Sequence, residues 1–334
     1  MKTAIAILNW NGQELLKEFL PSVVQHSVGA EIYVIDNASD DDSIQFLQNN
    51  FPAVKIIQNS ENFGFAKGYN FGVAQILKEN PEIELFCFLN SDVQVAENWL
   101  KPMVSLFEKN SEIAVAQPKI LDYKNSGKFE YAGAGGGFID NFGYPYCRGR
   151  VFWTLEEDKG QYDDTIQTFW ASGACFFIRT KDFIDSSGFD ESFFAHMEEI
   201  DLCWRLNNSG RKIYYCGQSK VYHLGGGTLK SNSPQKTYLN FRNNLGMLAK
   251  NLPKGKGFQL IFSRLILDGI TGIIFLFYEG LPHCWAIVRA HFGFYKRLPG
   301  YLRNSKPGIK NYYTKKLVPY QYFVKKRKIY TDLK

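Results

Sequence analysis

The sequence predicts an α/β fold, one large domain centred on a sheet and followed by a helical appendage. Short apolar runs typical of buried strands alternate with stretches of helical spacing along the first 120 residues. Most of these strands end in polar or acidic residues, so reactive side chains collect at turns. The length of 334 residues and a hydrophobic content of 45% suffice for such a domain and a C-terminal extension.

The first half is predicted to consist of βαβ units, whose crossovers are right-handed. Asn9 and Asn11 follow the first strand, and Asp36 closes the second. An Asp at the end of the second strand is where such folds contact a ribose or a base, although Asp36 or Ser39 could instead cap the next helix. The expected strands are 3–8, 31–35, 54–58 and 86–89, and the expected helices are 13–25, 41–49, 64–77 and 97–107.

The strand at residues 86–89 runs directly into Asn90, Ser91 and Asp92. Ligands of open α/β sheets bind beyond the carboxyl ends of the strands, so Asp92 is well placed to hold a metal ion. A carboxylate oxygen suits Mg²⁺ or Mn²⁺, which take further ligands from substrate phosphates and water. The alternative is that Asp92 caps the helix at 97–107.

Three glycines, Gly64, Gly68 and Gly72, recur every four residues where a helix opens. Such a stripe permits close approach of a ligand or of another backbone. The spacing is neither that of a Rossmann fingerprint nor that of a P-loop. Packing of the helix on the sheet would also explain it.

These motifs together resemble the nucleotide-sugar-binding half of family 2 glycosyltransferases with the GT-A fold, particularly the bacterial rhamnosyltransferase-like branch. The resemblance implies a mixed, Rossmann-like sheet with helices on both faces, with Asp36 reading the base and Asp92 binding the metal. Asn90 stands where the first Asp of the family's D-x-D-type motif is usual. By this resemblance the donor is bound by Asn9, Asn11, Asp36, Asn62, Gly64, Lys67, Asn90, Ser91 and Asp92.

The middle of the chain continues with a strand at 113–118 and a glycine-rich excursion through 133–137 and 142–150. This excursion is predicted to be a long loop or flap, too polar and glycine-rich for a core. Its Arg148 could meet donor phosphate or acceptor, or form a surface salt bridge. Trp170, before the small-residue turn 171–173 and a buried strand, is grouped with the acceptor-side or supporting residues.

Acids cluster at the start of the next helix, at Glu198, Glu199 and Asp201. They could simply complement the helix dipole, but such crowding of carboxylates also favours chemistry. The family resemblance makes Glu199 the catalytic base, although Asp is usual there, and places Glu198 beside it. Asp201 and Arg205, at i and i+4, are interpreted as a helix-surface ion pair.

A last strand at 213–215 leads toward His223, which precedes the glycines at 225–227. The resemblance makes His223 the second metal ligand, whereas a lone His is otherwise more often structural. The pattern Tyr238, Arg242, Asn243 continues the likeness on a helix expected to pack under the active site. The likeness covers residues 3–250, which divides the transferase domain 1–250 into a donor half, 1–118, and an acceptor half, 119–250.

Composition indicates where the chain works. The six cysteines have no paired spacing and no signal peptide is apparent, which predicts a reduced, cytoplasmic setting. Residues 289–334 carry 13 Lys and Arg against one acid, a net charge of +12, while the preceding residues carry −6.

Residues 251–334 are expected to form the helical, basic appendage. The stretch 258–288 is predicted to be an amphipathic hairpin in the membrane plane, because its cleanest apolar run of 10 residues is short of the roughly 20 needed to span a bilayer. Trp285 and the basic run 325–328 suit anionic headgroups. A homodimer interface would also explain the apolar face.

The sequence therefore predicts a metal-dependent, inverting glycosyltransferase at the inner face of the cell membrane. It would use Mg²⁺ or Mn²⁺ and a UDP- or dTDP-sugar, and act on a lipid-linked or cell-surface glycan; no nucleic acid partner is expected. A nucleotidyltransferase is one alternative, but Asn9 to Gly12 is no basic phosphate loop. A non-catalytic sugar-nucleotide-binding protein is another, motivated by Asn90 and Glu199, and donor turnover distinguishes it from an enzyme.

Overall fold

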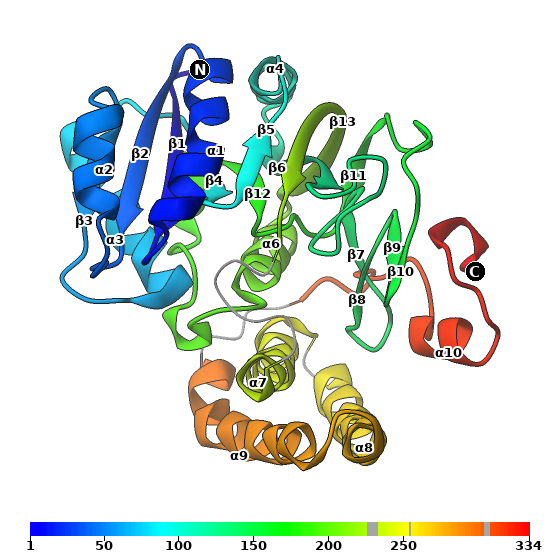
Figure 1. Ribbon diagram of the computed structural model, residues 1–334. Helices are drawn as coiled ribbons and strands as arrows, with labels where there is room; N and C mark the ends of the chain where they lie inside the picture. Colours follow the sequence, from blue (N-terminus) through cyan, green and yellow to red (C-terminus); the bar gives the residue numbers. More distant parts are fainter. Residues whose placement is uncertain (226–232, 254, 304–307) are drawn as a thin grey trace.

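A computed structural model of the chain, describing residues 1–225, 233–253, 255–303 and 308–334, has a mixed sheet at its centre (Figure 1). The strand order is β11-β13-β6-β12-β4-β1-β2-β3, with β5 paired to β13. Helices cover both faces, as the family resemblance implied. One core cluster packs α1, α2 and α4 on one face, and another packs α3, α6 and α7 on the other.

The donor half follows the predicted order closely. Strands β1, β2, β3 and β4 are parallel, and Asn9 lies opposite Asp36 while Leu8 lies opposite Asn90. The polar residues that end these strands therefore meet at one edge of the sheet. The elements are β1 (Thr3–Asn9), α1 (Gln13–His26), β2 (Ala30–Asp36), α2 (Ser43–Asn50), β3 (Lys55–Gln58), α3 (Gly64–Glu79) and β4 (Leu85–Asn90).

The second half adds antiparallel strands to the parallel ones. Strand β12 runs antiparallel between β4 and β6, which makes the sheet mixed. The long last strand β13 pairs in parallel with β6, and its end pairs antiparallel with the short β5. The elements are β5 (Val93–Val95), α4 (Leu100–Lys109), β6 (Ile113–Asp122), β11 (Thr165–Thr168), β12 (Cys175–Arg179), α5 (Thr180–Asp185), α6 (Glu198–Asn208) and β13 (Lys212–His223).

The expectation of a polar flap at 133–150 was wrong, because this segment is largely buried in a second, four-stranded sheet. Its glycines allow close packing: a Cβ on Gly137 would lie 2.2 Å from the indole of Trp170, and one on Gly149 would lie 2.5 Å from the ring of Phe129. Glycine here serves a tight core rather than a mobile loop. The strands are β7 (Gly137–Ile139), β8 (Pro145–Cys147), β9 (Arg150–Val151) and β10 (Thr154–Leu155).

Three long helices lie together on one side of the domain, at the bottom of Figure 1: α7 (Pro234–Asn251), α8 (Lys256–Tyr278) and α9 (Leu281–Arg303). The end of the chain leaves them, and α10 (Val318–Phe323) packs on the small sheet through Val318 and Tyr322. The basic run 325–328 therefore follows α10 and is not part of the three-helix layer.

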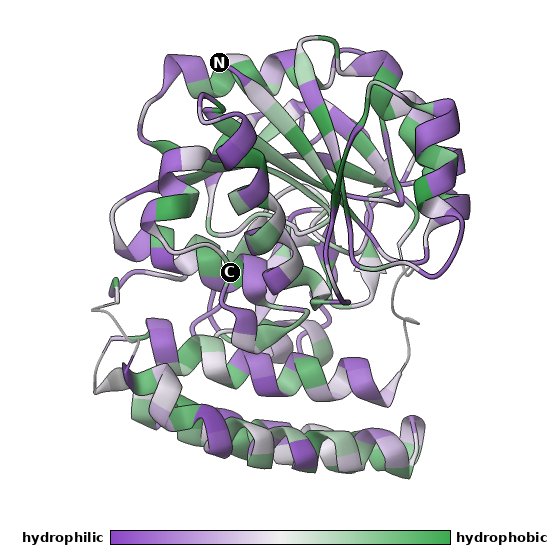
Figure 2. Cartoon of the chain, turned by 90° about the vertical axis from the view of Figure 1, so that its left-hand side faces the viewer, coloured by the Kyte–Doolittle hydropathy of each residue, from purple (hydrophilic) through white to green (hydrophobic). Residues whose placement is uncertain are grey.

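Helix α8 is continuous over 23 residues, because its charged residues do not interrupt the backbone. By length and composition its segment Gly257–Tyr278 could cross a membrane, so the expectation that the stretch is too short was wrong. Only 17% of its most apolar window is buried within the protein. Figure 2 shows hydrophobic residues along the outermost helices, far from the sheet.

Candidate active site

Asp92 and His223 meet beyond the ends of β4 and β13. Pairing of β5 with β13 sets Val93 opposite His223, which brings Asp92 Oδ1 to 3.1 Å from His223 Nε2. Both side chains are buried, and Asn90 Nδ2 lies 3.5 Å from the same ring nitrogen. Asp92 does not cap α4, which begins only at Leu100 and follows Trp99. The two predicted metal ligands are thus neighbours.

Sequence reasoning missed Glu130, a third buried group of this cluster. Its Oε2 lies 3.3 Å from Nδ1 of His223, on the side of the ring away from Asp92. Burial lowers the pKa of His223, but the carboxylates of Asp92 and Glu130 outweigh it and raise that pKa to about 10. Glu130 follows Phe129, which bridges to β6, and no sequence motif marks it.

This cluster fits a divalent cation. The chain supplies a carboxylate oxygen and, once the binding of a cation displaces the proton of His223, an imidazole nitrogen. Mg²⁺ and Mn²⁺ accept both donor types in a site completed by substrate phosphates. A carboxylate on the other ring nitrogen is the usual arrangement that orients a metal-binding His. Within the described residues no group of three or more His, Cys, Asp or Glu side chains is arranged to hold a metal ion.

The ends of β1 and β2 form a polar network around Asp36. Its carboxylate accepts hydrogen bonds from Asn9 Nδ2 at 2.9 Å, from the Ser39 hydroxyl at 2.6 Å and from the Ser39 N–H at 2.9 Å. Asn11 joins through its N–H, 2.9 Å from the same hydroxyl. Neither Asp36 nor Ser39 caps the next helix. Instead, Asp41 accepts a hydrogen bond from the Ser43 N–H at the start of α2.

The glycine stripe of α3 is explained by packing. A Cβ would lie 2.3 Å from Ile35 at Gly72, 3.0 Å from Asn37 at Gly68 and 2.7 Å from the ring of Phe194 at Gly64. Asn62 and Lys67 flank this helix start: Asn62 Oδ1 accepts from the Gly64 N–H, and the ammonium of Lys67 lies 3.7 Å above the ring of Phe63.

Glu199 lies on the first turn of α6, against the turn that leads into β12. A Cβ on Gly173 would lie 3.7 Å from its carboxyl carbon, and the next residue, Ala174, accepts a hydrogen bond from the Asn90 N–H at 2.9 Å. Glu199 therefore reaches the edge where β4 ends. Burial raises the pKa of the Glu199 carboxyl to about 7, although backbone N–H groups act in the opposite direction. Glu198 is more deeply buried, and burial together with the neighbouring Glu199 carboxylate raises its pKa well above the usual range of a glutamate.

The segment before Glu199 is strained. Phe194, His196 and Met197 have φ values of 66°, 68° and 74°, a conformation that L-residues rarely adopt. Asn243 of α7 holds the segment, since its Nδ2 lies 3.0 Å from the carbonyl of Phe193, 2.9 Å from that of Ala195 and 2.7 Å from that of His196. Arg242, beside it on α7, also donates to the carbonyl of Phe193, at 2.9 Å, so both residues hold the entry to α6.

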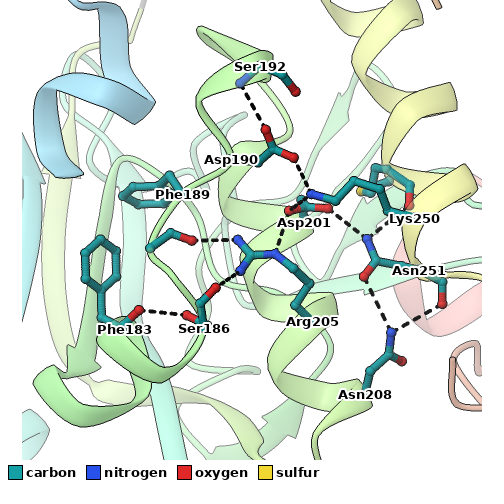
Figure 3. Close-up of polar contacts among 12 residues, drawn as sticks. Phe183, Ser186, Phe189, Asp190, Ser192, Asp201, Arg205, Asn208, Lys250 and Asn251 are labelled. Carbon is teal, nitrogen blue, oxygen red and sulfur yellow. Dashed lines mark hydrogen bonds and ion pairs between the residues drawn. The ribbon is translucent and has the colours of Figure 1, made fainter. Parts of the chain in front are cut away.

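Asp201 is fixed in a buried ionic cluster rather than on the helix surface (Figure 3). Arg205 Nε pairs with it at 2.8 Å, as predicted, but Lys250 Nζ and Asn251 Nδ2 of α7 also lie 2.8 Å from its oxygens. Lys250 reaches Asp190 as well, at 2.5 Å. The cluster joins α6 to α7 and leaves Asp201 no room for chemistry.

Replacing Lys250 by Met should destabilise the protein strongly. The change removes the ammonium group that lies between the carboxylates of Asp190 and Asp201. Breaking a buried ion pair in this way lowers the free energy of unfolding by about 3–5 kcal/mol. Denaturant unfolding measures this loss of stability, with Lys181→Met as the matched control: that lysine forms an exposed pair with Asp185, and exposed pairs contribute little to stability. Equal losses in both variants would contradict the structural role of the cluster.

Arg148 and Trp170 are engaged within the acceptor half. Arg148 pairs with both oxygens of Asp164, at 3.0 and 2.8 Å, and lies between the rings of Tyr162 and Tyr215. Trp170 donates from Nε1 to the carbonyl of Phe138 at 2.8 Å. Both are buried, so the contacts observed for them support the small sheet.

A family model described as glycosyl transferase family 2 matches residues 4–185, more than half of the chain. The chain belongs to glycosyl transferase family 2. The matched residues include the ends of β1, β2 and β4 and the strand β12 beside Glu199. This agrees with the resemblance seen in the motifs. A glycosyltransferase is an enzyme, so the nucleotidyltransferase and the non-catalytic alternatives are set aside.

Several curated relatives are sugar transferases. The hexosyltransferase Agl10 of low-salt glycan biosynthesis, from Haloferax volcanii, is 24% identical over 72% of this chain and 73% of its own length. The rhamnosyltransferase WbbL of Escherichia coli is 23% identical over 66% of this chain and 82% of its own. The N-acetylglucosaminyl-diphospho-decaprenol L-rhamnosyltransferase of Mycobacterium tuberculosis is 24% identical over 58% of this chain and 66% of its own length.

Solved structures share the GT-A fold. GalNAc-T7 with UDP, GalNAc and Mn²⁺ matches 75% of this family 2 chain and 48% of its own, with a TM-score of 0.56 and 19% identity. The mannosyltransferase PcManGT of Pyrobaculum calidifontis, in complex with GDP-Man and Mn²⁺, matches 88% of this chain and 87% of its own, with a TM-score of 0.53 and 10% identity. At these identities the likeness concerns the fold.

Proposed function

We propose that this transferase moves a sugar from a UDP- or dTDP-sugar to a hydroxyl group of a growing, lipid-linked cell-surface glycan, with inversion at the anomeric carbon. The observation that carries the proposal is the shared sheet edge, where the pair of Asp92 and His223 and the carboxyl of Glu199 lie beyond β4, β13 and β12. Residues 1–250 would carry the reaction. The names of the relatives support a hexosyl or rhamnosyl donor and, in one case, a lipid-linked acceptor.

The chain's own residues divide the work between two sides of the site. Asp36 and its network with Asn9 orient the nucleoside, and Asn90 and Ser91 border the sugar-diphosphate. Glu199 takes the proton of the acceptor hydroxyl as that oxygen attacks the anomeric carbon from the face opposite the nucleotide. With a pKa of about 7, the carboxylate is basic enough to accept that proton and still ionised in a useful fraction at neutral pH.

Asp92 and His223 would hold Mg²⁺ or Mn²⁺ together with the donor diphosphate, with Glu130 orienting the imidazole. A cation bound there supplies Lewis-acid stabilisation of the leaving nucleotide. GT-A neighbours whose structures contain Mn²⁺ support this choice.

The test is nucleotide release from a panel of sugar nucleotides, run with Mn²⁺ and with EDTA. We expect one UDP- or dTDP-sugar to be turned over in Mn²⁺, to stabilise the protein against heat, and to lose both effects in EDTA. Turnover that is equal in EDTA would contradict the metal dependence. No turnover of any member of a panel that includes GDP-sugars would contradict the donor class.

We further propose that the transferase works at the inner face of the cell membrane, with α8 and α9 lying in the membrane plane. The burial of α8 is the reverse of that in a soluble helix: Arg264 and Asp268 are buried at 3% and 0% exposure, while Phe258 and Phe277 are about 80% exposed. Charged residues that face the protein while apolar ones face outward are typical of helices in contact with lipid. The exposed residues recur at helical spacing, and we call them the outer apolar face: Phe258, Phe262, Ile266, Ile270, Ile273 and Phe277 of α8 with Leu281, Trp285, Phe292 and Leu302 of α9.

Two contacts favour an in-plane position over a helix that crosses the bilayer. Arg264 donates to the carbonyl of Phe142 at 2.9 Å and lies 3.7 Å above the ring of Tyr144, which ties the first half of α8 to the small sheet. Asp268 pairs with His291 of α9 at 3.6 Å. One side of α8 is thus held along the catalytic domain.

A basic stripe on α9 borders the outer apolar face. Arg289, Lys296 and Arg303 are exposed and seven residues apart, so they share one side of the helix. Replacing all three by Gln should weaken flotation with anionic liposomes on the order of 100-fold, since each basic residue near such a surface contributes about 1 kcal/mol. Liposome flotation with anionic and neutral lipids measures it.

The matched control replaces three exposed lysines elsewhere, Lys17, Lys101 and Lys128, by Gln, with flotation expected to be unchanged. A different outcome would make the outer apolar face a homodimer interface instead. In that case the wild type would not float, and it would be a stable dimer that dissociates when Phe262 and Ile270 are replaced by Ser.

A further inference from the structure

A groove opens among the ends of the three helices that lie beneath the catalytic domain. It has a volume of about 560 Å³, within the range of ligand sites, and its lining is mainly hydrophobic. Its lining includes Leu252 at the C-terminal end of α7, Ile261 and Leu265 of α8, and Phe294, Leu298 and Leu302 of α9. The family resemblance assigns nothing to this place.

The groove is continuous with the outer apolar face. Phe258 and Phe262 belong to both, and they are 80% and 59% exposed. A hydrocarbon chain in the leaflet could therefore enter the groove sideways without passing through water. A water-soluble ligand would have to cross that apolar rim.

Positive charge lies beside the groove. Tyr295 and Leu302 line it, and each is followed directly by an exposed member of the basic stripe, Lys296 and Arg303. This arrangement suits an amphiphile with one apolar chain and a phosphate or diphosphate head, because the head can pair with these cations while the chain is buried.

Helix α7 connects the groove to the active site. Ala249 and Leu252 line the groove, while the intervening Lys250 and Asn251 bind Asp201 on the helix that carries Glu199. The groove therefore lies next to the residues that support the catalytic base. An acceptor whose chain is bound there would keep its sugar near the active site, because chain and sugar belong to one molecule. An ordinary membrane lipid would gain no such advantage from this position.

We propose that the groove among α7, α8 and α9 binds the hydrocarbon chain of the lipid-linked acceptor. The inference rests on the proposed function for the identity of the acceptor, but the binding of the chain can be tested without sugar transfer. It assigns to α8 and α9 a role in substrate recognition in addition to contact with the membrane.

The test is binding of farnesyl phosphate to the full-length protein in EDTA, so that a metal and diphosphate site does not contribute. We expect farnesyl phosphate to bind at least tenfold more tightly than geranyl phosphate, because each further buried CH₂ strengthens binding about fourfold. Inorganic phosphate should not compete. Leu265→Trp, which fills the groove, should abolish binding, whereas Ile273→Trp, on the outer apolar face but outside the groove lining, should leave it intact.

Binding that survives Leu265→Trp, or that is lost equally in both variants, would overturn the proposal. So would equal displacement by a soluble short-chain phosphatidylglycerol, because the groove would then be a site for ordinary membrane lipid. Nucleotide release in the sugar-nucleotide panel separates the two failures: release without farnesyl phosphate binding removes the groove and keeps the transferase, and binding without release of any nucleotide removes the acceptor assignment.

Discussion

Replacing Glu199 by Gln should lower sugar transfer by about 10² to 10⁴, the usual contribution of a general base, while donor affinity stays the same. The amide keeps the size of the side chain and its contact with the turn at Gly173, so the loss reports on proton acceptance rather than on shape. Transfer is followed by nucleotide release with acceptor present, and donor binding by calorimetric titration with Mn²⁺.

The pH profile provides the internal control for this variant. The pKa of Glu199 is raised to about 7 by burial, so the carboxyl is protonated and inactive below that pH and ionised above it. Wild-type activity should therefore rise as the pH passes through about 7, and the residual activity of Glu199→Gln should lack this rise. Glu79→Gln, an exposed acid at the end of α3, should behave as wild type. Full turnover by Glu199→Gln would remove this residue from the mechanism.

The parts of the fold predicted well are those governed by local pattern. The strands β1, β2 and β4 are buried apolar runs closed by polar residues, and in a parallel sheet such runs must end at one edge. This rule alone places Asn9, Asp36 and Asn90 together, as their registers show. The proximity of His223 to Asp92 followed from the family resemblance, because the pairing of β5 with β13 has no local signal.

The parts of the fold that were predicted poorly depend on tertiary contacts between segments far apart in the chain. The glycines between 133 and 149 predict a long loop or flap, whereas the structure shows that Gly137 and Gly149 allow Trp170 and Phe129 to pack closely against the backbone. Arg264 and Asp268 shorten the apolar run that the sequence shows in this stretch, yet both are buried and the helix continues through them. Glu130 was missed for the same reason, since its partner is 93 residues away and only the tertiary fold brings it to His223.

Replacing Asp92 by Asn should abolish metal-dependent donor binding. The amide preserves the shape of the side chain but removes its negative charge, and hard divalent cations prefer carboxylate oxygens. Mn²⁺ affinity should fall by at least about 100-fold, more than the 10- to 100-fold expected for Glu130→Gln, which only orients the imidazole. Free Mn²⁺ measured by electron paramagnetic resonance, with UDP or dTDP present, gives these affinities directly.

The two active-site variants test each other. Glu199→Gln should bind Mn²⁺ and nucleotide like the wild type and fail in transfer, whereas Asp92→Asn should fail already in binding. The separation arises because the two carboxylates stand on different elements: Asp92 is fixed by the end of β4 next to His223, and Glu199 by the start of α6 next to Gly173. If Asp92→Asn kept full Mn²⁺ affinity, the cation would have to lie elsewhere, and the division of the sheet edge into a donor side and an acceptor side would fail with it.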